Sequence, residues 1–146
     1  MIRAKLRKRK IIKMRNKKIA QMLNDIADIA VGQIKKDLSK GKDINGKAFA
    51  PLKNSTIKAK RRKGSKFPTK PLIDTGLMKN VYRSRNASAS SLISEVSTAK
   101  ARSEVAIYHN TGAGSLPERL WFGIGKKTKR RYDKYIRARL RKVFKP

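Results

Sequence analysis

The side chains best suited to catalysis in this sequence are one histidine and nine acidic residues. His109 precedes a glycine-rich turn, and Asp74 and Glu104 are the candidates for a carboxylate partner. A metal-dependent nuclease needs several carboxylates that converge on its ions, whereas the acids here are scattered singly, and Asp25 and Asp28 fall on one ordinary amphipathic helix. We therefore expect no catalytic residue, no metal and no cofactor, and interpret His109 as a packed turn residue. The sequence also lacks the glycine motifs that bind nucleotide phosphates.

Basic residues dominate the composition. Forty Lys and Arg stand against nine Asp and Glu, which gives a formal net charge of +31 in 146 residues. A merely solvated surface mixes both signs of charge, so an excess of this size predicts a polyanionic partner. Nucleic acid is a better candidate than a membrane or an acidic protein.

The basic residues form three blocks, at 3–18, 58–66 and 126–145. Aromatic residues do not alternate with them as a platform for stacking bases would require. We therefore predict contacts with the phosphate backbone and no reading of bases. The residues predicted on charge alone to bind nucleic acid are Arg3, Lys5, Arg7, Lys8, Arg9, Lys10, Lys13, Arg15, Lys58, Lys60, Arg61, Arg62, Lys63, Lys129, Arg130 and Arg131.

Two further absences in the sequence narrow the class of protein. There is no cysteine, which excludes a disulfide framework, a cysteine-based zinc site and a thiol nucleophile. No apolar run approaches the roughly 18 residues needed to cross a bilayer, and no signal-peptide core follows the basic N-terminus. We expect a mature protein with no membrane partner.

The most regular pattern is helical and extends from about Lys17 to Lys40. Its apolar residues recur at spacings of one, three and four, and Gly41 is a natural stop. The apolar stripe consists of Ile19, Met22, Leu23, Ile26, Ala30, Ile34 and Leu38. Residues 1–18 form a basic N-terminal arm, which is either disordered or the exposed start of this helix. Residues 19–146 are expected to form one domain that ends in a basic C-terminal helix.

The rest of the sequence predicts both helices and strands. The expected elements are a tight turn at Asn45-Gly46, a short helix or loop at 57–66 with Ser55 or Thr56 as its N-cap, strands at 92–97 and 103–108, and a helix from Lys129 onward. These elements predict an α+β fold, in which a long N-terminal helix and a C-terminal helix pack on a small, mostly antiparallel sheet.

Four segments of the chain also follow one another in a recognisable order: Asn-Gly-Lys with Phe-Ala-Pro-Leu at 45–52, Pro-Leu-Ile-Asp-Thr-Gly-Leu at 71–77, Ile-Tyr-His-Asn-Thr-Gly at 107–112, and Pro-Glu-Arg-Leu-Trp-Phe-Gly at 117–123. Together with the flanking helices they resemble the Mu-like phage virion-morphogenesis family, also called tail-completion or head–tail neck proteins. The resemblance covers residues 20–144. Its motif residues here are Phe49, Leu72, Thr75, Gly76, His109, Gly112, Pro117, Arg119 and Trp121.

The resemblance implies a structural virion protein of a tailed phage and not an enzyme. Such a protein is assembled in the host cytoplasm and occupies the head–tail junction or the tail end. It forms a homo-oligomeric ring, contacts other neck and tail proteins, and lies close to packaged double-stranded DNA. The family often has Trp at the position of Phe49, and the basic arm and tail exceed its pattern. DNA contact by those blocks therefore rests on their charge.

The motifs also have a physical interpretation. Gly76 allows a sharp turn where a side chain does not fit, and Arg119 could reach a carboxylate of its own or a neighbouring subunit, with Glu118 and Asp74 as candidates. These residues either shape the fold or act directly in assembly. Two other classes stay open: an RNA-binding protein of the ribosomal type, which also joins a small domain to basic extensions, and a DNA-processing enzyme.

Overall fold

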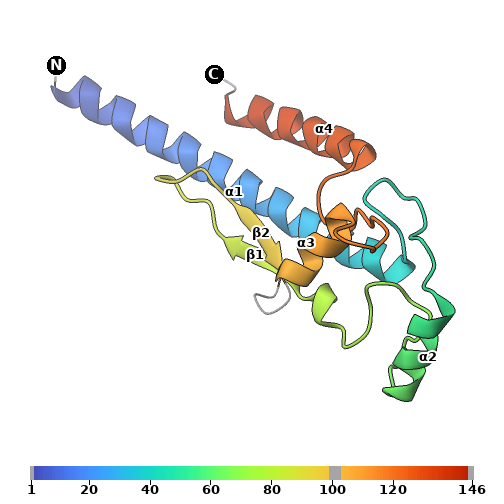
Figure 1. Ribbon diagram of the computed structural model, residues 1–146. Coiled ribbons are helices and arrows are strands. Elements are labelled where there is room, and N and C mark those ends of the chain that lie inside the picture. Colours follow the sequence, from blue (N-terminus) through green and yellow to red (C-terminus); the bar gives the residue numbers. More distant parts are fainter. Residues whose placement is uncertain (1, 99–102, 145–146) are drawn as a thin grey trace.

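The computed structural model describes residues 2–98 and 103–144, apart from the side chains of residues 2–8, 103 and 127. The chain forms the predicted α+β fold (Figure 1). Its elements are α1 (Ile2–Lys40), α2 (Asn54–Arg62), the 3-10 helix η1 (Leu77–Lys79), β1 (Val81–Arg85), β2 (Glu95–Thr98), α3 (Ser103–Thr111) and α4 (Lys126–Val143).

Helix α1 is 39 residues long and extends much further toward the N-terminus than its apolar stripe predicts. Residues 2–18 therefore form the start of this helix, the second of the two forms expected for the basic arm, and residues 9–15 are exposed. The predicted end is confirmed: Gly41 takes a positive φ of 67°, and its N–H donates to the Leu38 carbonyl at 3.1 Å. Glycine reaches this left-handed conformation without a Cβ clash.

Strands β1 and β2 pair antiparallel, with Val81 opposite Thr98 and a bulge between Arg83 and Arg85. The pair is joined to α1 by polar contacts. The Arg83 guanidinium meets the Asp28 carboxylate at 2.6 Å and the Asn24 carbonyl at 3.1 Å. The Asn24 side chain accepts from the N–H of Ala87 at 2.8 Å and donates to its carbonyl at 3.1 Å, which holds the chain beyond β1 against the helix.

The strand predicted at 103–108 is wrong, because this segment belongs to helix α3. Its alternation of polar and apolar residues is too short to separate a period of two from a helical one. In the structure the inward residues follow helical spacing: Ala106 is buried, and Asn110 and His109 are partly buried one turn later. The strand predicted at 92–97 is present in shortened form as β2.

The two basic helices also differ from their predicted boundaries. Helix α2 begins at Asn54 after Lys53, so neither Ser55 nor Thr56 is its N-cap, and no side chain among the described residues caps it. Helix α4 begins at Lys126, three residues before the predicted start. Both starts lie in segments with little apolar pattern, where sequence periodicity marks helix ends poorly.

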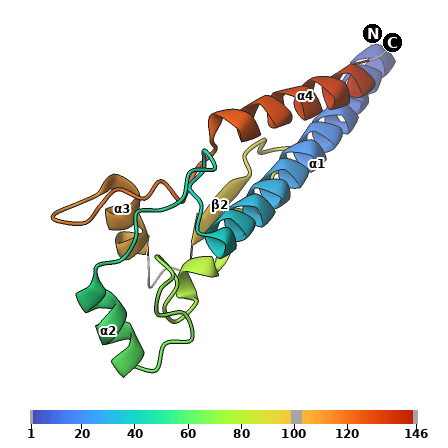
Figure 2. The same cartoon turned by 90° about the vertical axis from the view of Figure 1, so that its right-hand side faces the viewer.

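The core lies between α1, the sheet, α3 and the loops that precede α2 and α4. Its buried residues are Ile34, Leu38, Phe49, Met78, Val81, Ala106 and Trp121. Helix α4 packs along α1, on a different side from the sheet and not on the sheet as predicted, and both views show the two helices side by side (Figures 1 and 2). The Tyr135 hydroxyl donates to the Asp25 carboxylate at 3.1 Å across this contact.

The start of α4 depends on a glycine. A Cβ on Gly125 would lie 1.9 Å from the Ile44 carbonyl oxygen, which is far inside contact distance.

We predict that Gly125→Ala lowers the free energy of unfolding by about 2–3 kcal/mol, because the backbone must move apart. Gly32→Ala is the matched control, since within the described residues nothing lies within 4 Å of its Cβ. In the exposed helix interior it should raise stability by about 0.5–1 kcal/mol. Urea unfolding followed by circular dichroism measures both; equal effects would contradict the close approach.

Candidate functional site

Three of the four motif segments meet at Arg119. This residue is only 4% exposed, and its guanidinium donates from Nε and one Nη to the Ala50 carbonyl at 3.4 and 3.2 Å. Its backbone N–H donates to the His109 carbonyl at 2.8 Å. Arg119 therefore joins the first, third and fourth segments in one place.

The carboxylate partner expected for Arg119 is not what the structure contains. Its guanidinium points to the backbone of Ala50, and the ion pairs among the described residues involve Arg83, Arg85 and Arg139 instead. Within the chain the physical cause is that a partly buried loop must satisfy its carbonyl groups, and a guanidinium is a strong donor. A carboxylate of a neighbouring subunit stays a prediction. Of the two roles left open, the geometry of Arg119 supports shaping the fold.

Asn110 makes a second link between the third and fourth segments. Its side-chain oxygen accepts from the N–H groups of Trp121 and Phe122 at 3.0 and 3.1 Å. The Trp121 indole N–H donates to the Ala106 carbonyl at 3.1 Å, and the residue is 1% exposed. Trp121 and Phe49 are both members of the core. These motif residues thus hold irregular chain segments against the helices.

Glycine ends α3 where the third motif ends. Gly112 has a φ of 69°, and a Cβ there would lie 3.1 Å from the backbone nitrogen of Glu118. The position therefore needs glycine both for its left-handed backbone and for the approach of the fourth segment. Pro117, the motif residue that follows in this loop, is exposed.

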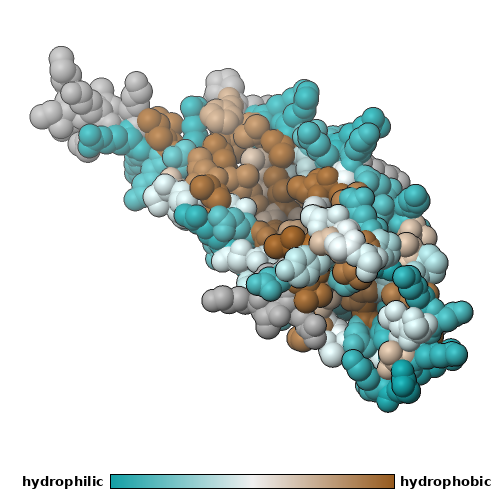
Figure 3. All heavy atoms as spheres, viewed as in Figure 1, coloured by the Kyte–Doolittle hydropathy of each residue, from teal (hydrophilic) through white to brown (hydrophobic). Residues whose placement is uncertain are grey.

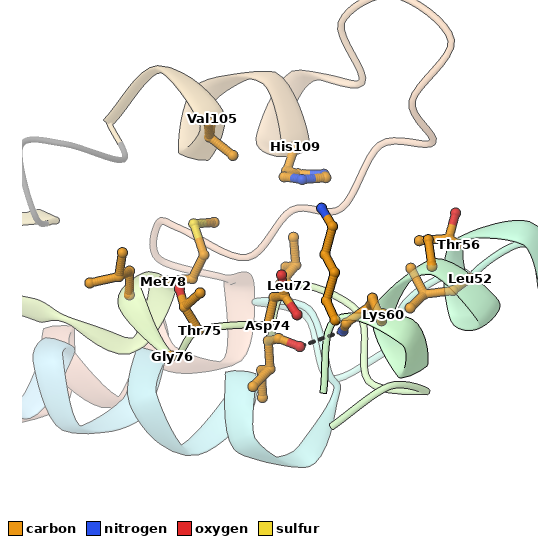
Figure 4. Close-up of a pocket in the computed structure, with 14 residues that line it drawn as sticks. Leu52, Thr56, Lys60, Leu72, Asp74, Thr75, Gly76, Met78, Val105 and His109 are labelled. Carbon is orange, nitrogen blue, oxygen red and sulfur yellow. Dashed lines mark hydrogen bonds between the residues drawn. The ribbon is translucent and has the colours of Figure 1, made fainter. Parts of the chain in front are cut away.

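The second segment forms one wall of a pocket. The cavity has a volume of about 320 Å³ and lies between α2, residues 72–78 and α3 (Figure 4). Gly76 precedes η1 and has a φ of 83°, which confirms the sharp turn predicted there. The expected lack of space for a side chain is wrong, because nothing among the described residues lies within 4 Å of a Cβ at Gly76, and glycine is favoured there by its left-handed backbone alone. Leu72 also has a positive φ, 60°, an unusual conformation for a bulky residue. Thr75 is exposed at the wall of the pocket.

Lys60 is not available for nucleic acid, contrary to the prediction from its charge. It is 9% exposed, and its ammonium donates to the carbonyls of Phe67 at 2.9 Å, Lys70 at 2.9 Å and Ile73 at 2.5 Å. Burial lowers the pKa of Lys60, while nearby Asp74 opposes that shift. The three donors of the ammonium match three carbonyls of the 67–73 loop, so Lys60 holds this loop onto α2.

His109 contributes a polar group to the same pocket. Figure 4 shows that His109 and Val105 project from α3 toward the segment that contains Leu72. Within the described part of the chain, the buried His109 Nδ1 has no hydrogen-bond partner. Burial lowers the pKa of His109, and the positive charge of Arg119 lowers it further. Both effects favour the neutral form of the His109 imidazole beside the cavity.

The other predicted nucleic-acid residues lie in three places: the N-terminal half of α1, the start of α4 beside residues 30–37 of α1, and α2. The side chains of Arg3, Lys5, Arg7 and Lys8 lie outside the described residues. The part of α1 around Arg15 lies beside the end of α4, where the Arg15 guanidinium is 5.3 Å from the centre of the Phe144 ring, and the first residues of α1 extend past that end (Figure 1). The α2 block lies at the opposite end of the molecule (Figures 1 and 2). The exposed members are Arg9, Lys10, Lys13, Arg15, Lys58, Arg61, Arg62, Lys63, Lys129, Arg130 and Arg131.

The α1–α4 end, where the N-terminal half of α1 meets the C-terminal half of α4, therefore combines parts of two basic blocks, but it does not include Lys129, Arg130 or Arg131. A cleft of about 310 Å³ separates the helices, and Lys18, Arg139 and Lys142 line it. Asp25 lies in the same cleft and is 4.0 Å from Arg139. The sequence alone does not predict that Lys18 and Arg139 line one cleft, because this depends on how α4 packs on α1.

Comparisons with known proteins do not extend this description: no family model, curated protein or solved structure matches the chain. Among the described residues, no group of three or more His, Asp and Glu side chains lies close enough to hold a metal ion. In that same part of the chain, no helix is both long enough and apolar enough to cross a membrane.

The role of Arg119 can be tested by its removal. We predict that Arg119→Ala lowers the free energy of unfolding by about 2 kcal/mol, because the Ala50 carbonyl loses a charged donor inside the protein. Glu118→Ala is the control, since Glu118 is the exposed neighbour and its loss should cost less than about 0.5 kcal/mol. Chemical unfolding measures both; similar values for the two variants would argue against the buried link.

The neutral state of His109 predicts a pH dependence. The folded pKa lies below the ordinary value of about 6.5, so unfolding takes up a proton in the window between the two values. The stability contributed by His109 is present above pH of about 6.5 and is lost as the pH falls toward the folded pKa. His109→Gln should flatten this part of the profile. Urea unfolding between pH of about 7 and 5 tests it; a wild-type slope retained in the variant would contradict the prediction.

Proposed function

We propose that this chain is a structural virion protein of a tailed phage: a tail-completion or head–tail connector subunit that forms a ring with copies of itself. The observation that carries the proposal is the meeting of the four resembling segments. Arg119 binds the backbone of Ala50 and His109, Asn110 binds the backbone of Trp121, and residues 72–76 line the pocket beside His109. Because these segments contact one another in the fold, a protein that contains one of them is expected to contain the others, and this agrees with the resemblance to one family.

The apolar surface of α1 supports assembly with further copies. Ile12, Ile19, Leu23 and Ile26 share one side of the helix by their spacing, and none of them is fully buried. Figure 3 shows hydrophobic atoms gathered over the middle of α1 and the adjoining part of α4. An apolar surface of this kind on a small domain is suited to a subunit contact. In a ring, each copy would cover this face on its neighbour.

The charge supports a site beside a polyanion. Copies with a charge of +31 repel one another, so assembly needs an anionic partner that offsets the repulsion. The combined basic end formed by α1 and α4 would contact DNA phosphates at the head–tail junction or the tail end, without reading bases. The mechanism is positional: the ring holds DNA and neighbouring virion proteins in place, and no covalent bond is made or broken.

Native mass spectrometry or mass photometry at moderate salt tests the proposal, with and without duplex DNA. We predict a closed ring that duplex DNA favours, because DNA offsets the repulsion between subunits. Ile12→Asp should weaken self-association at least about tenfold, since burying a carboxylate costs more than ~1.4 kcal/mol. Met14→Asp is the matched control: both residues are about half exposed, at 50% and 56%, but they point to opposite sides of the helix.

Other outcomes would favour the alternatives. A strict monomer that binds structured RNA more tightly than DNA would favour an RNA-binding protein of the ribosomal type. Cleavage of DNA with Mg²⁺ or Mn²⁺ would favour a DNA-processing enzyme. Equal effects of Ile12→Asp and Met14→Asp on assembly would place the subunit contact elsewhere.

A further inference from the structure

The N-terminal half of α1 projects from the rest of the molecule as a single helix. Every residue from Arg9 to Arg15 is exposed. At the end of this stretch, the Asn16 amide donates to the Ala89 carbonyl at 3.3 Å, and the Arg15 guanidinium lies over the Phe144 ring. Figure 1 shows the helix continuing beyond the tip of the β1–β2 hairpin and beyond the end of α4. This stretch therefore offers most of its circumference to a partner.

The exposed cations of residues 9–18 lie on two flanks of this helix. At about 100° of rotation per residue, one group shares an arc of about 100° and the other an arc of about 60°. The first flank consists of Arg9, Lys10, Lys13 and Lys17, and the second consists of Arg15 and Lys18. The sequence has no acidic residue before Asp25. A flat anionic surface would contact one flank only, whereas an anionic groove would contact both.

The apolar residues of the same stretch do not form a single face. Ile11, Ile12 and Met14 are 47%, 50% and 56% exposed, and their spacing spreads them over an arc of about 160°. Arg15 falls between Ile11 and Ile12 on this arc. A helix that lies in a membrane interface keeps its apolar side chains on one face and its cations on the other. The arrangement therefore fits a polyanion better than a lipid surface.

Repulsion along the first flank also favours a polyanion. Arg9, Lys13 and Lys17 follow one another at spacings of four residues, so their side chains are neighbours on the helix surface. Like charges at this spacing destabilise a helix. The ion pairs among the described residues do not include any of the three. Phosphates beside this row would offset the repulsion.

The dimensions of the helix match one groove of duplex DNA. An α-helix with its side chains is about 10–12 Å across, and the major groove of B-form DNA is about 12 Å wide, whereas the minor groove is about 6 Å wide. We propose that the exposed N-terminal part of α1 lies in the major groove of duplex DNA, with one cationic flank facing the phosphates of each strand. Because the contacts are to phosphates, they require no particular base sequence.

This placement leaves the proposed subunit contact free. The two flanks are separated by arcs of about 80° and about 120°, and Ile12 lies in the wider one. With the narrower arc toward the floor of the groove, Ile12 faces away from the DNA. The inference rests on the proposed function, because it specifies how the α1–α4 end of each subunit holds the DNA.

Methylation by dimethyl sulfate tests the groove, because this reagent attacks guanine N7 in the major groove and adenine N3 in the minor groove. The probe is a mixed-sequence duplex of two helical turns, about 20 base pairs, and the full-length chain is added to saturation. We predict a loss of methylation at guanine N7 and unchanged methylation at adenine N3. Both bases are measured in one sample, so each duplex contains its own control.

A double variant locates the contact on α1. Arg9→Ala with Lys13→Ala removes two exposed cations of the first flank and should reduce the slope of log affinity against log salt by about 1.8, because each lost phosphate contact reduces it by about 0.9. Lys58→Ala with Arg61→Ala removes the same charge from exposed positions of α2 and should leave the slope and the N7 protection unchanged. Alanine favours helix at all of these positions, and equal circular dichroism spectra establish that the variants fold alike.

Three results would overturn the inference: a bound duplex in which adenine N3 or neither base is protected, an equal change of slope in the two double variants, or tighter binding of duplex RNA of the same sequence, whose major groove is too narrow to admit the helix. Self-association of the same samples keeps the two proposals apart. A ring whose DNA keeps its N7 methylation would overturn the groove placement alone, whereas a monomer that protects N7 would overturn the ring alone. A chain that binds no duplex DNA would overturn the groove placement and the DNA contact together.

Discussion

The fold depends on hydrogen bonds that satisfy the backbone of buried, irregular segments. The regular sheet in the described part of the chain is only the β1–β2 pair, so loops form much of the layer that covers α1 and α3. Buried loops are unstable unless their N–H and C=O groups find partners. Asn110 provides one acceptor for two N–H groups, and Arg119 provides donors for the Ala50 carbonyl. These links let the irregular segment that contains Trp121 pack into the core with its backbone satisfied.

The buried cations change how the basic composition is interpreted. Lys60 and Arg119 each bind backbone carbonyls, and burial lowers the pKa of both. Taking a charge out of water is costly, and the hydrogen bonds only partly offset that cost. In this chain the same residue type therefore has two uses: most basic residues face solvent, whereas these two hold loops. Charge counting assigned Lys60 to nucleic acid because composition does not distinguish a surface ammonium from a structural one.

Sequence patterns predicted those elements in which an apolar pattern recurs over many residues. The apolar stripe that ends at Leu38 and the Gly41 stop predicted α1, and the α+β class followed. The pattern failed at α3, where six residues carry too little periodicity to separate strand from helix. It also missed the positive φ of Leu72 and the link from Arg119 to Ala50. Both depend on segments distant in sequence meeting in space, which a local pattern does not contain.

Exposed basic residues gather in separate parts of the molecule, with one group at the cleft between α1 and α4 and another on α2. At one end, α1 and α4 bring parts of two basic blocks together around a cleft that includes Lys18, Arg139 and Lys142. Phosphates suit this surface because counterion release needs only closely spaced exposed cations. At the other end, Lys58, Arg61 and Arg62 lie by their spacing on the face of α2 opposite the residues that line the apolar cavity. In the ring that we propose, an anionic partner at the α1–α4 cleft would reduce the repulsion between subunits that each carry a charge of +31.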